Sequence, residues 1–109
     1  MLSRENRLRK RKDFDNIFKN GKAKTGGFIF LKFLKNGLNV SRFGFIVSLK
    51  IAKKAVVRNK IKRRLRQAIR NNINEIKPGF DIVITAKPEI VNKNYQEIKN
   101  ELENLFKTL

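Results

Sequence analysis

Residues 55–73 read AVVRNKIKRRLRQAIRNNI and carry seven Lys or Arg residues, with Lys54 just before them and no acid. Apolar residues recur at spacings of three and four, which predicts a helix with one buried side. They are Val57, Ile61, Leu65, Ala68, Ile69 and Ile73. The other side of this helix would present concentrated positive charge. Such a surface binds polyanions, and nucleic acid is the most common of them.

A solvated helix surface is the plain alternative. Helices that merely face water usually mix acidic and basic residues and gain from pairs four residues apart, whereas here like charges repel. Arg58 and Lys62 also fall within the apolar stripe on a helical wheel. Because burying an unpaired charge is costly, we expect both at the edge of the stripe, aimed at an anion. These two observations favour nucleic-acid binding.

The spacing Arg58-Asn59-x-x-Lys62-Arg63-x-x-Arg66 closely resembles the signature of the protein subunit of bacterial ribonuclease P. That enzyme is a ribonucleoprotein whose RNA cleaves the leader from precursor tRNA. The resemblance covers nearly the whole chain and includes Asn6-Arg7-Leu8, Asp13-Phe14 with Phe18, Arg42-Phe43-Gly44-Phe45 and Ser48-x-Lys50. The chain departs from the family at Leu49, which separates Ser48 from Lys50, and at Phe30 and Leu31, where the family often has Tyr.

The resemblance implies a binding role for each of two surfaces. The basic helix would bind the catalytic RNA subunit through Arg58, Asn59, Lys62, Arg63, Arg66 and Arg70. A cleft would bind the 5′ leader of precursor tRNA through Arg7, Phe14, Phe18, Phe30, Lys50 and Lys53. Aromatic residues among cations suit single strands, because each stacked base contributes about 1–3 kcal/mol. Phe14 and Phe18 also fit plain core packing, and Phe28 is the alternative to Phe30.

Composition predicts one folded domain over residues 1–109. Hydrophobic residues make up 40% of the chain and include nine Phe, too many for a disordered basic tail. The net charge of +18 is uneven, because residues 1–74 hold 22 Lys and Arg against three acids, whereas residues 75–109 hold five Lys against six acids. We therefore expect the first two-thirds of the chain to bind RNA and the last third to be scaffold.

The chain lacks the usual means of catalysis. It has no Cys and no His, which excludes disulfides, thiolate metal sites and the usual general base. Asp13 and Asp15 would point in different directions on a helix, and Asp13 is better interpreted as an N-cap. Asp81 and Glu89 flank a strand and lack partners. We expect the protein alone to be inactive, with no metal site, and the resemblance implies that Mg²⁺ serves the RNA subunit.

Other functions remain open as alternatives. A ribosomal or other structural RNA-binding protein would share the charge and size, and dependence on a particular RNA would separate the two. A DNA-binding module usually places its recognition helix after a short helix and a tight turn, whereas this helix follows strands. A membrane-surface helix would favour Trp, and no apolar run is long enough to span a bilayer or to form a signal peptide. We expect a cytoplasmic protein that is monomeric by itself and binds neither DNA nor membrane.

The predicted fold is α+β, a single-domain α/β sandwich in the order α-β-β-β-α-β-α, with helices packed on a mixed four-stranded sheet. The predicted elements are a basic arm (1–12), a helix (13–20), a strand (28–35), a hairpin turn at Asn36-Gly37, strands at 42–48 and 50–52, the basic helix, a strand (80–86) and a helix from Asn94. The strand–helix–strand unit suggests a parallel pair, and such crossovers are almost always right-handed. The resemblance implies a left-handed one.

Overall fold

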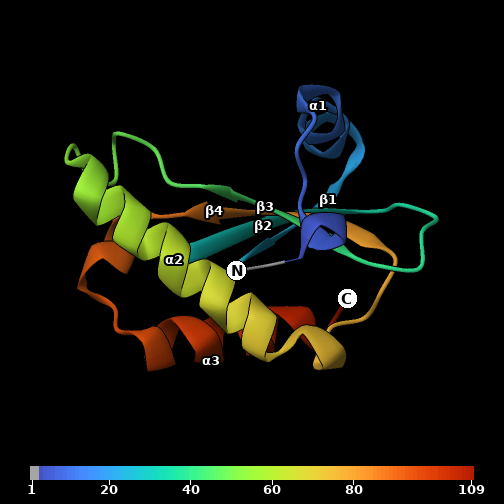
Figure 1. Ribbon diagram of the computed structural model, residues 1–109. Coiled ribbons are helices and arrows are strands. Elements are labelled where there is room, and N and C mark those ends of the chain that lie inside the picture. The colour runs from blue at the N-terminus through green and yellow to red at the C-terminus, as the bar shows by residue number, and fades with distance from the viewer. Residues whose placement is uncertain (1–2) are drawn as a thin grey trace.

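The computed structural model describes residues 3–109 as three helices around one four-stranded sheet (Figure 1). The helices are α1 (Arg11–Asn20), α2 (Ala55–Asn71) and α3 (Tyr95–Phe106), and the strands are β1 (Lys22–Thr25), β2 (Ile29–Lys35), β3 (Arg42–Ile46) and β4 (Phe80–Ala86). Short 3₁₀ turns lie at Arg4–Asn6, Ile73–Glu75 and Pro88–Asn92. The predicted α+β class is therefore confirmed. The order α-β-β-β-α-β-α also agrees, although β1 was not predicted and no strand forms at 50–52.

The sheet has the strand order β1-β2-β4-β3. β1 and β2 pair antiparallel, as do β2 and β4, whereas β3 and β4 pair parallel. β4 lies inside the sheet and is buried on both faces, which explains why its sequence FDIVITA is almost continuously apolar. β1 is a short edge strand, KAKT, whose lysines discourage pairing with another chain.

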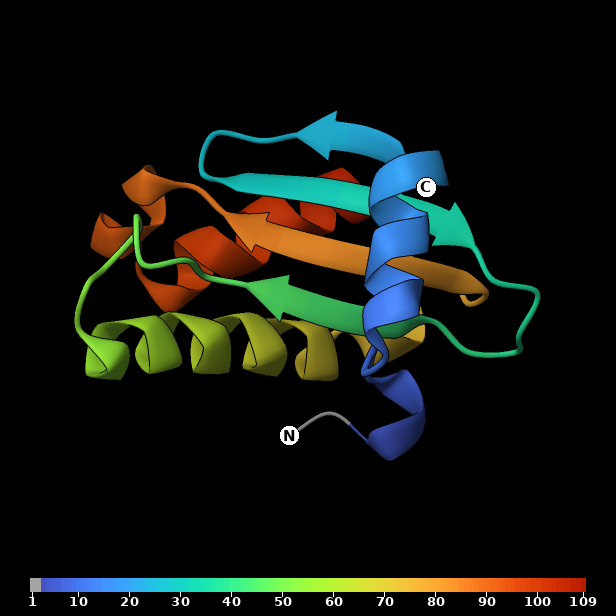
Figure 2. The same ribbon diagram turned by 90° about the horizontal axis from the view of Figure 1, so that it is seen from above.

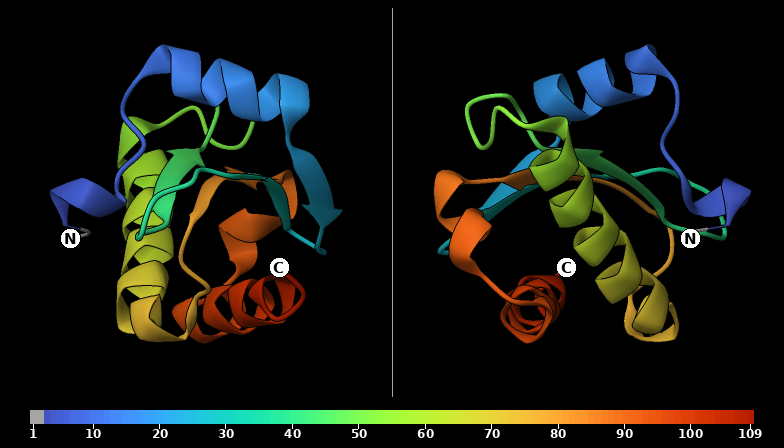
Figure 3. Two further views of the ribbon diagram at one scale, coloured as in Figure 1. Left: turned by 90° about the vertical axis from the view of Figure 1, so that its right-hand side faces the viewer. Right: turned by 60° about the vertical axis from the view of Figure 1, so that its left-hand side comes forward.

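The helices cover the sheet unequally. α1 crosses one face, whereas α2 and α3 pack against each other on the opposite face (Figures 1 and 3). Viewed from the α1 side, β3 and β4 both point left, β4 lies above β3, and α2 passes behind the sheet (Figure 2). The crossover from β3 through α2 to β4 is therefore left-handed, as the resemblance implied and against the general preference.

Two predicted features of the strands are wrong. Asn36 and Gly37 do not form a hairpin, because β4 lies between β2 and β3, and the Asn36 N–H instead donates to the carbonyl of Gly79, just before β4. Residues 50–52 form a turn rather than a strand, with the Ile51 N–H donating to the Ser48 carbonyl over 3.0 Å. The strand β1 was not predicted from the sequence, because its residues are mostly polar and do not alternate with apolar ones.

The main core lies between the sheet and the pair α2 and α3. The predicted stripe of α2 is confirmed: Ile61, Leu65, Ala68 and Ile69 are buried, with Val57 and Ile73 at the margin. A smaller cluster on the other face joins Leu8, Ile17 and Val83, with Phe14, Leu34 and Ile46 packed around it. This second cluster holds α1 on the sheet.

The described part of the predicted arm, which begins at Ser3, is packed rather than free. The Leu8 side chain is buried, and its N–H donates to the Phe43 carbonyl over 2.9 Å at the outer edge of β3. α1 begins at Arg11, so Asp13 is not the N-cap predicted for it but lies in the first turn. Its carboxylate lies 3.7 Å from the Arg42 guanidinium instead, which connects α1 to β3.

α3 begins as predicted, after Asn94, with a capping box formed by Asn94 and Glu97. Farther along this helix, the Glu101 carboxylate accepts hydrogen bonds from the N–H groups of Gly27 and Phe28, over 2.7 and 3.1 Å. A Cβ on Gly26 would lie 2.7 Å from the Glu101 carboxyl carbon. Glycine at position 26 thus lets the turn between β1 and β2 reach α3.

We expect Glu101→Ala to lower the free energy of unfolding by about 1–2 kcal/mol, because it leaves two backbone donors without their acceptor. Urea denaturation measures this loss. The control is Glu103→Ala, which removes a half-exposed ion pair with Lys99, four residues away on the same helix, at 3.7 Å and should cost less than about 0.5 kcal/mol. Equal losses in the two variants would show that the Glu101 bonds contribute nothing specific.

Candidate nucleic-acid interface

The outward side of α2 is a continuous basic surface. Asn59, Arg63, Arg66 and Arg70 are exposed and Lys62 is half-buried; these five residues are called the basic side of α2 below. Among the described residues, no ion pair involves a cation of α2, and the helix contains no acid. The charge therefore stays uncompensated within the protein, which favours a polyanionic partner.

Two cations of α2 donate hydrogen bonds to backbone carbonyls of the protein itself. Arg64 donates from Nη1 to the Lys93 carbonyl over 3.0 Å. Arg58 donates from Nη1 to the carbonyls of Ala52 and Lys53, over 2.9 and 2.7 Å. Arg58 lies at the margin of the apolar stripe, as predicted. Nothing in the sequence indicated that its guanidinium would bind two backbone carbonyls, and we expected it to face an anion.

A hollow of about 290 Å³ lies between the arm, α1 and α2. The residues that line it are Arg7, Leu8, Phe14, Phe43, Gly44, Phe45 and Arg66. The Arg66 guanidinium lies 5.9 Å from the centroid of the Phe45 ring, within cation–π range. A Cβ on Gly44 would come within 2.5 Å of the Phe14 ring, so glycine is what allows this ring to lie on β3. The hollow brings together Arg7 and Phe14 from the predicted leader cleft and Arg66 from the basic helix.

The other predicted leader residues surround a part of the sheet that no helix covers. Phe30, Thr85 and Ile46 are half-buried on the α1 side of β2, β4 and β3, toward the ends of these strands that α1 leaves uncovered, and Ile46 also packs against the smaller cluster; they are called the open sheet face below. Register places Phe30 on this side, because its neighbours Ile29 and Leu31 are buried in the main core. Phe28 belongs to the main core side and contacts Lys93.

Phe18 lies on α1, and Lys50 and Lys53 lie on the loop between β3 and α2, two segments on the same side of the sheet. The Phe18 side chain is 41% exposed on α1, too open for the plain core-packing role. Phe14 is more enclosed and packs against the smaller cluster. Lys50 and Lys53 are exposed on the loop between β3 and α2, which rises on the same side of the sheet as α1 (Figure 1).

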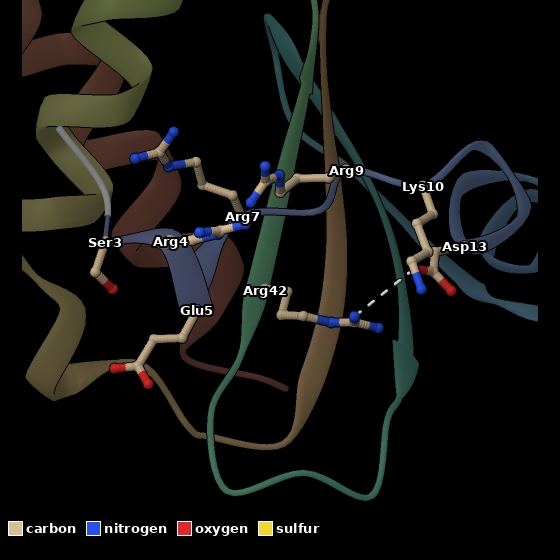
Figure 4. Close-up of a pocket in the computed structure, with 8 residues that line it drawn as sticks. All are labelled: Ser3, Arg4, Glu5, Arg7, Arg9, Lys10, Asp13 and Arg42. Carbon is tan, nitrogen blue, oxygen red and sulfur yellow. Dashed lines mark ion pairs between the residues drawn. The ribbon is translucent and has the colours of Figure 1, made fainter.

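The arm adds a second basic hollow that the sequence patterns did not single out. It is an open depression of about 650 Å³, lined by Ser3, Arg4, Glu5, Arg7, Arg9, Lys10, Asp13 and Arg42 (Figure 4). The many Lys and Arg residues between positions 4 and 12 could have indicated this hollow from the sequence. Arg42 is held there by Asp81, with Nε and Nη2 donating over 2.8 and 2.6 Å. These hydrogen bonds raise the pKa of Arg42.

The carboxylates do not assemble into a catalytic or metal site. Asp13 and Asp15 face different arginines, Arg42 and Arg11. Asp81, predicted to lack partners, binds Arg42 and accepts from Asn36. In the part of the chain that the structure describes, no group of three or more potential ligand side chains could hold a metal ion, so these residues do not fit a protein-bound Mg²⁺. None of the described helices is long and apolar enough to cross a membrane.

The fold and these surfaces define an α+β nucleic-acid-binding protein. Its uncompensated basic helix lies beside a hollow that contains aromatic rings. The carboxylates of Asp13 and Asp81 bind Arg42, and that of Glu101 binds backbone N–H groups.

Comparison with known proteins identifies the family. The family model described as Ribonuclease P matches residues 2–109. The ribonuclease P protein component of Fusobacterium nucleatum is 42% identical over 106 residues, covering 94% of this chain and 95% of that protein. The solved ribonuclease P protein of Thermotoga maritima has a TM-score of 0.88 at 37% identity, covering 94% of this chain and 96% of that one. The Staphylococcus aureus structure gives 0.86 at 30% identity, covering 94% of each chain.

The chain belongs to the ribonuclease P protein family. It is a component of the ribonuclease P holoenzyme, which processes the 5′ ends of tRNA, and its partners are the ribonuclease P RNA and the tRNA substrate.

Proposed function

We propose that the basic side of α2 binds the ribonuclease P RNA. The observation that carries this assignment is the absence, among the described residues, of any ion pair to the α2 cations. Arg63, Arg66 and Arg70 are exposed, and a guanidinium can bind a phosphate through two parallel hydrogen bonds. Asn59 lies on the same side and can add a contact to a base or a sugar hydroxyl.

The 5′ leader of precursor tRNA lies, in this proposal, across the open sheet face between α1 and the loop that carries Lys50 and Lys53. Phe18 and Phe30 offer rings for stacking, and the lysines offer charge to the backbone. Stacking of this kind tolerates any sequence, because every base has a π-face. Arg66 lies on α2 and also lines the hollow that contains Arg7 and Phe14, so two of the predicted leader residues lie next to the basic side of α2.

The protein contributes charge rather than catalytic groups in this proposal. Mg²⁺ for the cleavage would be held by the RNA. Protein cations near the RNA phosphates would reduce their mutual repulsion and so favour the binding of these ions. We also propose that the protein acts in the cytoplasm, is monomeric by itself, and does not bind DNA or membrane as part of this function.

Phe18→Leu is expected to weaken holoenzyme binding to precursor tRNA by about 1–2 kcal/mol, roughly five- to thirtyfold, because it removes a stacking ring. Binding to mature tRNA, which has no leader, should not change. Phe18 suits this test better than Phe14, because its exposure (41%) leaves little packing to lose. Leu38→Ala, at an exposed position (48%) in the loop between β2 and β3, is the control and should alter neither affinity.

The assignment of the leader to this face would be wrong if Phe18→Leu bound the two RNAs as tightly as the unaltered protein. It would also be wrong if both affinities fell together, since that result would indicate a contact with the tRNA body or a general loss of structure. Thermal unfolding of the two variants separates these cases.

A further inference from the structure

Arg58 connects α2 to the loop that precedes it. Its side chain is half-buried, and Nη1 donates to the carbonyls of Ala52 and Lys53 over 2.9 and 2.7 Å. Both carbonyls lie just before α2, whose N-cap is Lys54. One N–H of Nη1 is available for each carbonyl, and hydrogen bonds from a charged donor are stronger than neutral ones.

The loop has few other contacts that could hold its shape. Within residues 48–53 one backbone hydrogen bond closes a turn, from the Ile51 N–H to the Ser48 carbonyl, and Ile51 packs partly on the core. Ser48, Leu49, Lys50 and Lys53 are exposed. In the described chain, Arg58 is the one side chain from outside the loop that hydrogen-bonds to it.

The same loop carries the two lysines that the proposed function places against the leader. No ion pair among the described residues involves Lys50 or Lys53. The Lys53 carbonyl is itself one of the acceptors of Arg58, so the direction in which the Lys53 side chain leaves the backbone depends on this bond.

We infer that Arg58 is a positioning residue for the leader-binding loop rather than mainly a phosphate contact. It fixes the backbone of residues 52 and 53 so that Lys50 and Lys53 face the open sheet face. This inference rests on the proposed function, because it assigns those lysines to the leader. It gives the first arginine of the R-N-x-x-K-R-x-x-R pattern a different role from the arginines at positions 63, 66 and 70.

Lysine at position 58 would keep the positive charge but lose the planar group that reaches both carbonyls. Arg58→Lys therefore separates positioning from charge. Arg63→Lys is the matched control, since Arg63 is exposed on the same helix, and we assign it to RNA binding only.

The first measurement uses the free protein without RNA. Amide hydrogen exchange at Ile51, whose N–H makes the one backbone hydrogen bond within the loop, should become about tenfold faster in Arg58→Lys, the loss expected for about 1.4 kcal/mol of hydrogen bonding. In Arg63→Lys the exchange of this amide should not change. Unaltered exchange in Arg58→Lys would overturn the inference, since the loop would then be held by something else.

The second measurement is the affinity of the reconstituted holoenzyme for precursor tRNA relative to mature tRNA. Arg58→Lys should lower this ratio by about as much as the double variant Lys50→Ala and Lys53→Ala. Combining all three changes should add little, because coupled residues are not additive. Arg63→Lys should leave the ratio unchanged.

The failures can be told apart. If the lysine double variant lowers the ratio but Arg58→Lys does not, the lysines bind the leader without help from Arg58, and the positioning role is wrong. If neither variant lowers the ratio, the proposed assignment of this loop to the leader is wrong, and the inference falls with it. If the effects of Arg58→Lys and of the double variant simply add, Arg58 acts independently, which also overturns the inference.

Discussion

Replacing Arg63 and Arg70 together with Ala is expected to weaken binding of the ribonuclease P RNA by about 2–3 kcal/mol, roughly 30- to 150-fold at moderate salt. Both side chains are exposed on the basic side of α2, so each lost guanidinium removes a phosphate contact without opening the core. The slope of log affinity against log salt concentration should also become shallower by about 0.7–0.9 for each contact. A salt titration with the isolated RNA subunit measures both quantities.

The control for this pair removes the same charge from Lys99 on α3 and from Lys107 just after it. Lys99→Ala with Lys107→Ala also lowers the net charge by two, in the part of the chain where acids and bases balance. It should leave the affinity within about twofold and the salt slope nearly unchanged, because general attraction depends only weakly on distant exposed charges. Equal losses in the two double variants would mean that net charge, rather than the basic side of α2, determines RNA binding.

Asp81→Ala is expected to lower the free energy of unfolding by about 2–3 kcal/mol, because it leaves a partly buried guanidinium without its partner. Arg42 binds both oxygens of this carboxylate, and Asn36 donates to one of them over 2.8 Å. The Asp81 side chain is only 10% exposed, so water cannot fully replace these bonds. For a domain of this size the melting temperature should fall by roughly 10–20 °C.

The control is Asp15→Ala, which removes an ion pair of a different kind. Asp15 and Arg11 are 4.0 Å apart and both are largely exposed, so their contribution should be below about 0.5 kcal/mol. Calorimetry of the two variants in one buffer gives the comparison. A similar melting temperature for both would show that the network around Asp81 adds no more stability than a surface pair.

The parts of the fold that the sequence predicted well are those with strong local patterns. The spacing of Ile61, Leu65 and Ile69 predicts a buried stripe, and the apolar spacing after Asn94 predicts the last helix. The order of the strands in the sheet was harder to predict, because the sequence of an apolar strand does not indicate which strand pairs with it. Nothing in residues 36–37 could show that β4 would lie between β2 and β3, and the handedness of the crossover came from the resemblance alone.

The candidate site was likewise predictable only in part. A helical wheel is enough to put Arg63 and Arg70 in solvent, and the cation content of the chain indicates the class of ligand. A helical wheel cannot locate the backbone carbonyls of a neighbouring loop, so the hydrogen bonds from Arg58 to Ala52 and Lys53 were not predicted. The hollow around Phe45 also depends on Gly44, whose role is visible only where α1 crosses β3.

Site-specific crosslinking tests most directly whether the two surfaces bind different RNAs. The chain has no native Cys, so a photoreactive group can be attached at one introduced position on α2 (Gln67→Cys), on the open sheet face (Thr85→Cys) or on α3 (Asn104→Cys). In a holoenzyme bound to precursor tRNA, the α2 label should crosslink to the ribonuclease P RNA, the sheet label to the 5′ leader, and the α3 label to neither. A sheet label that reacts with the ribonuclease P RNA while the α2 label reacts with the leader would contradict this assignment.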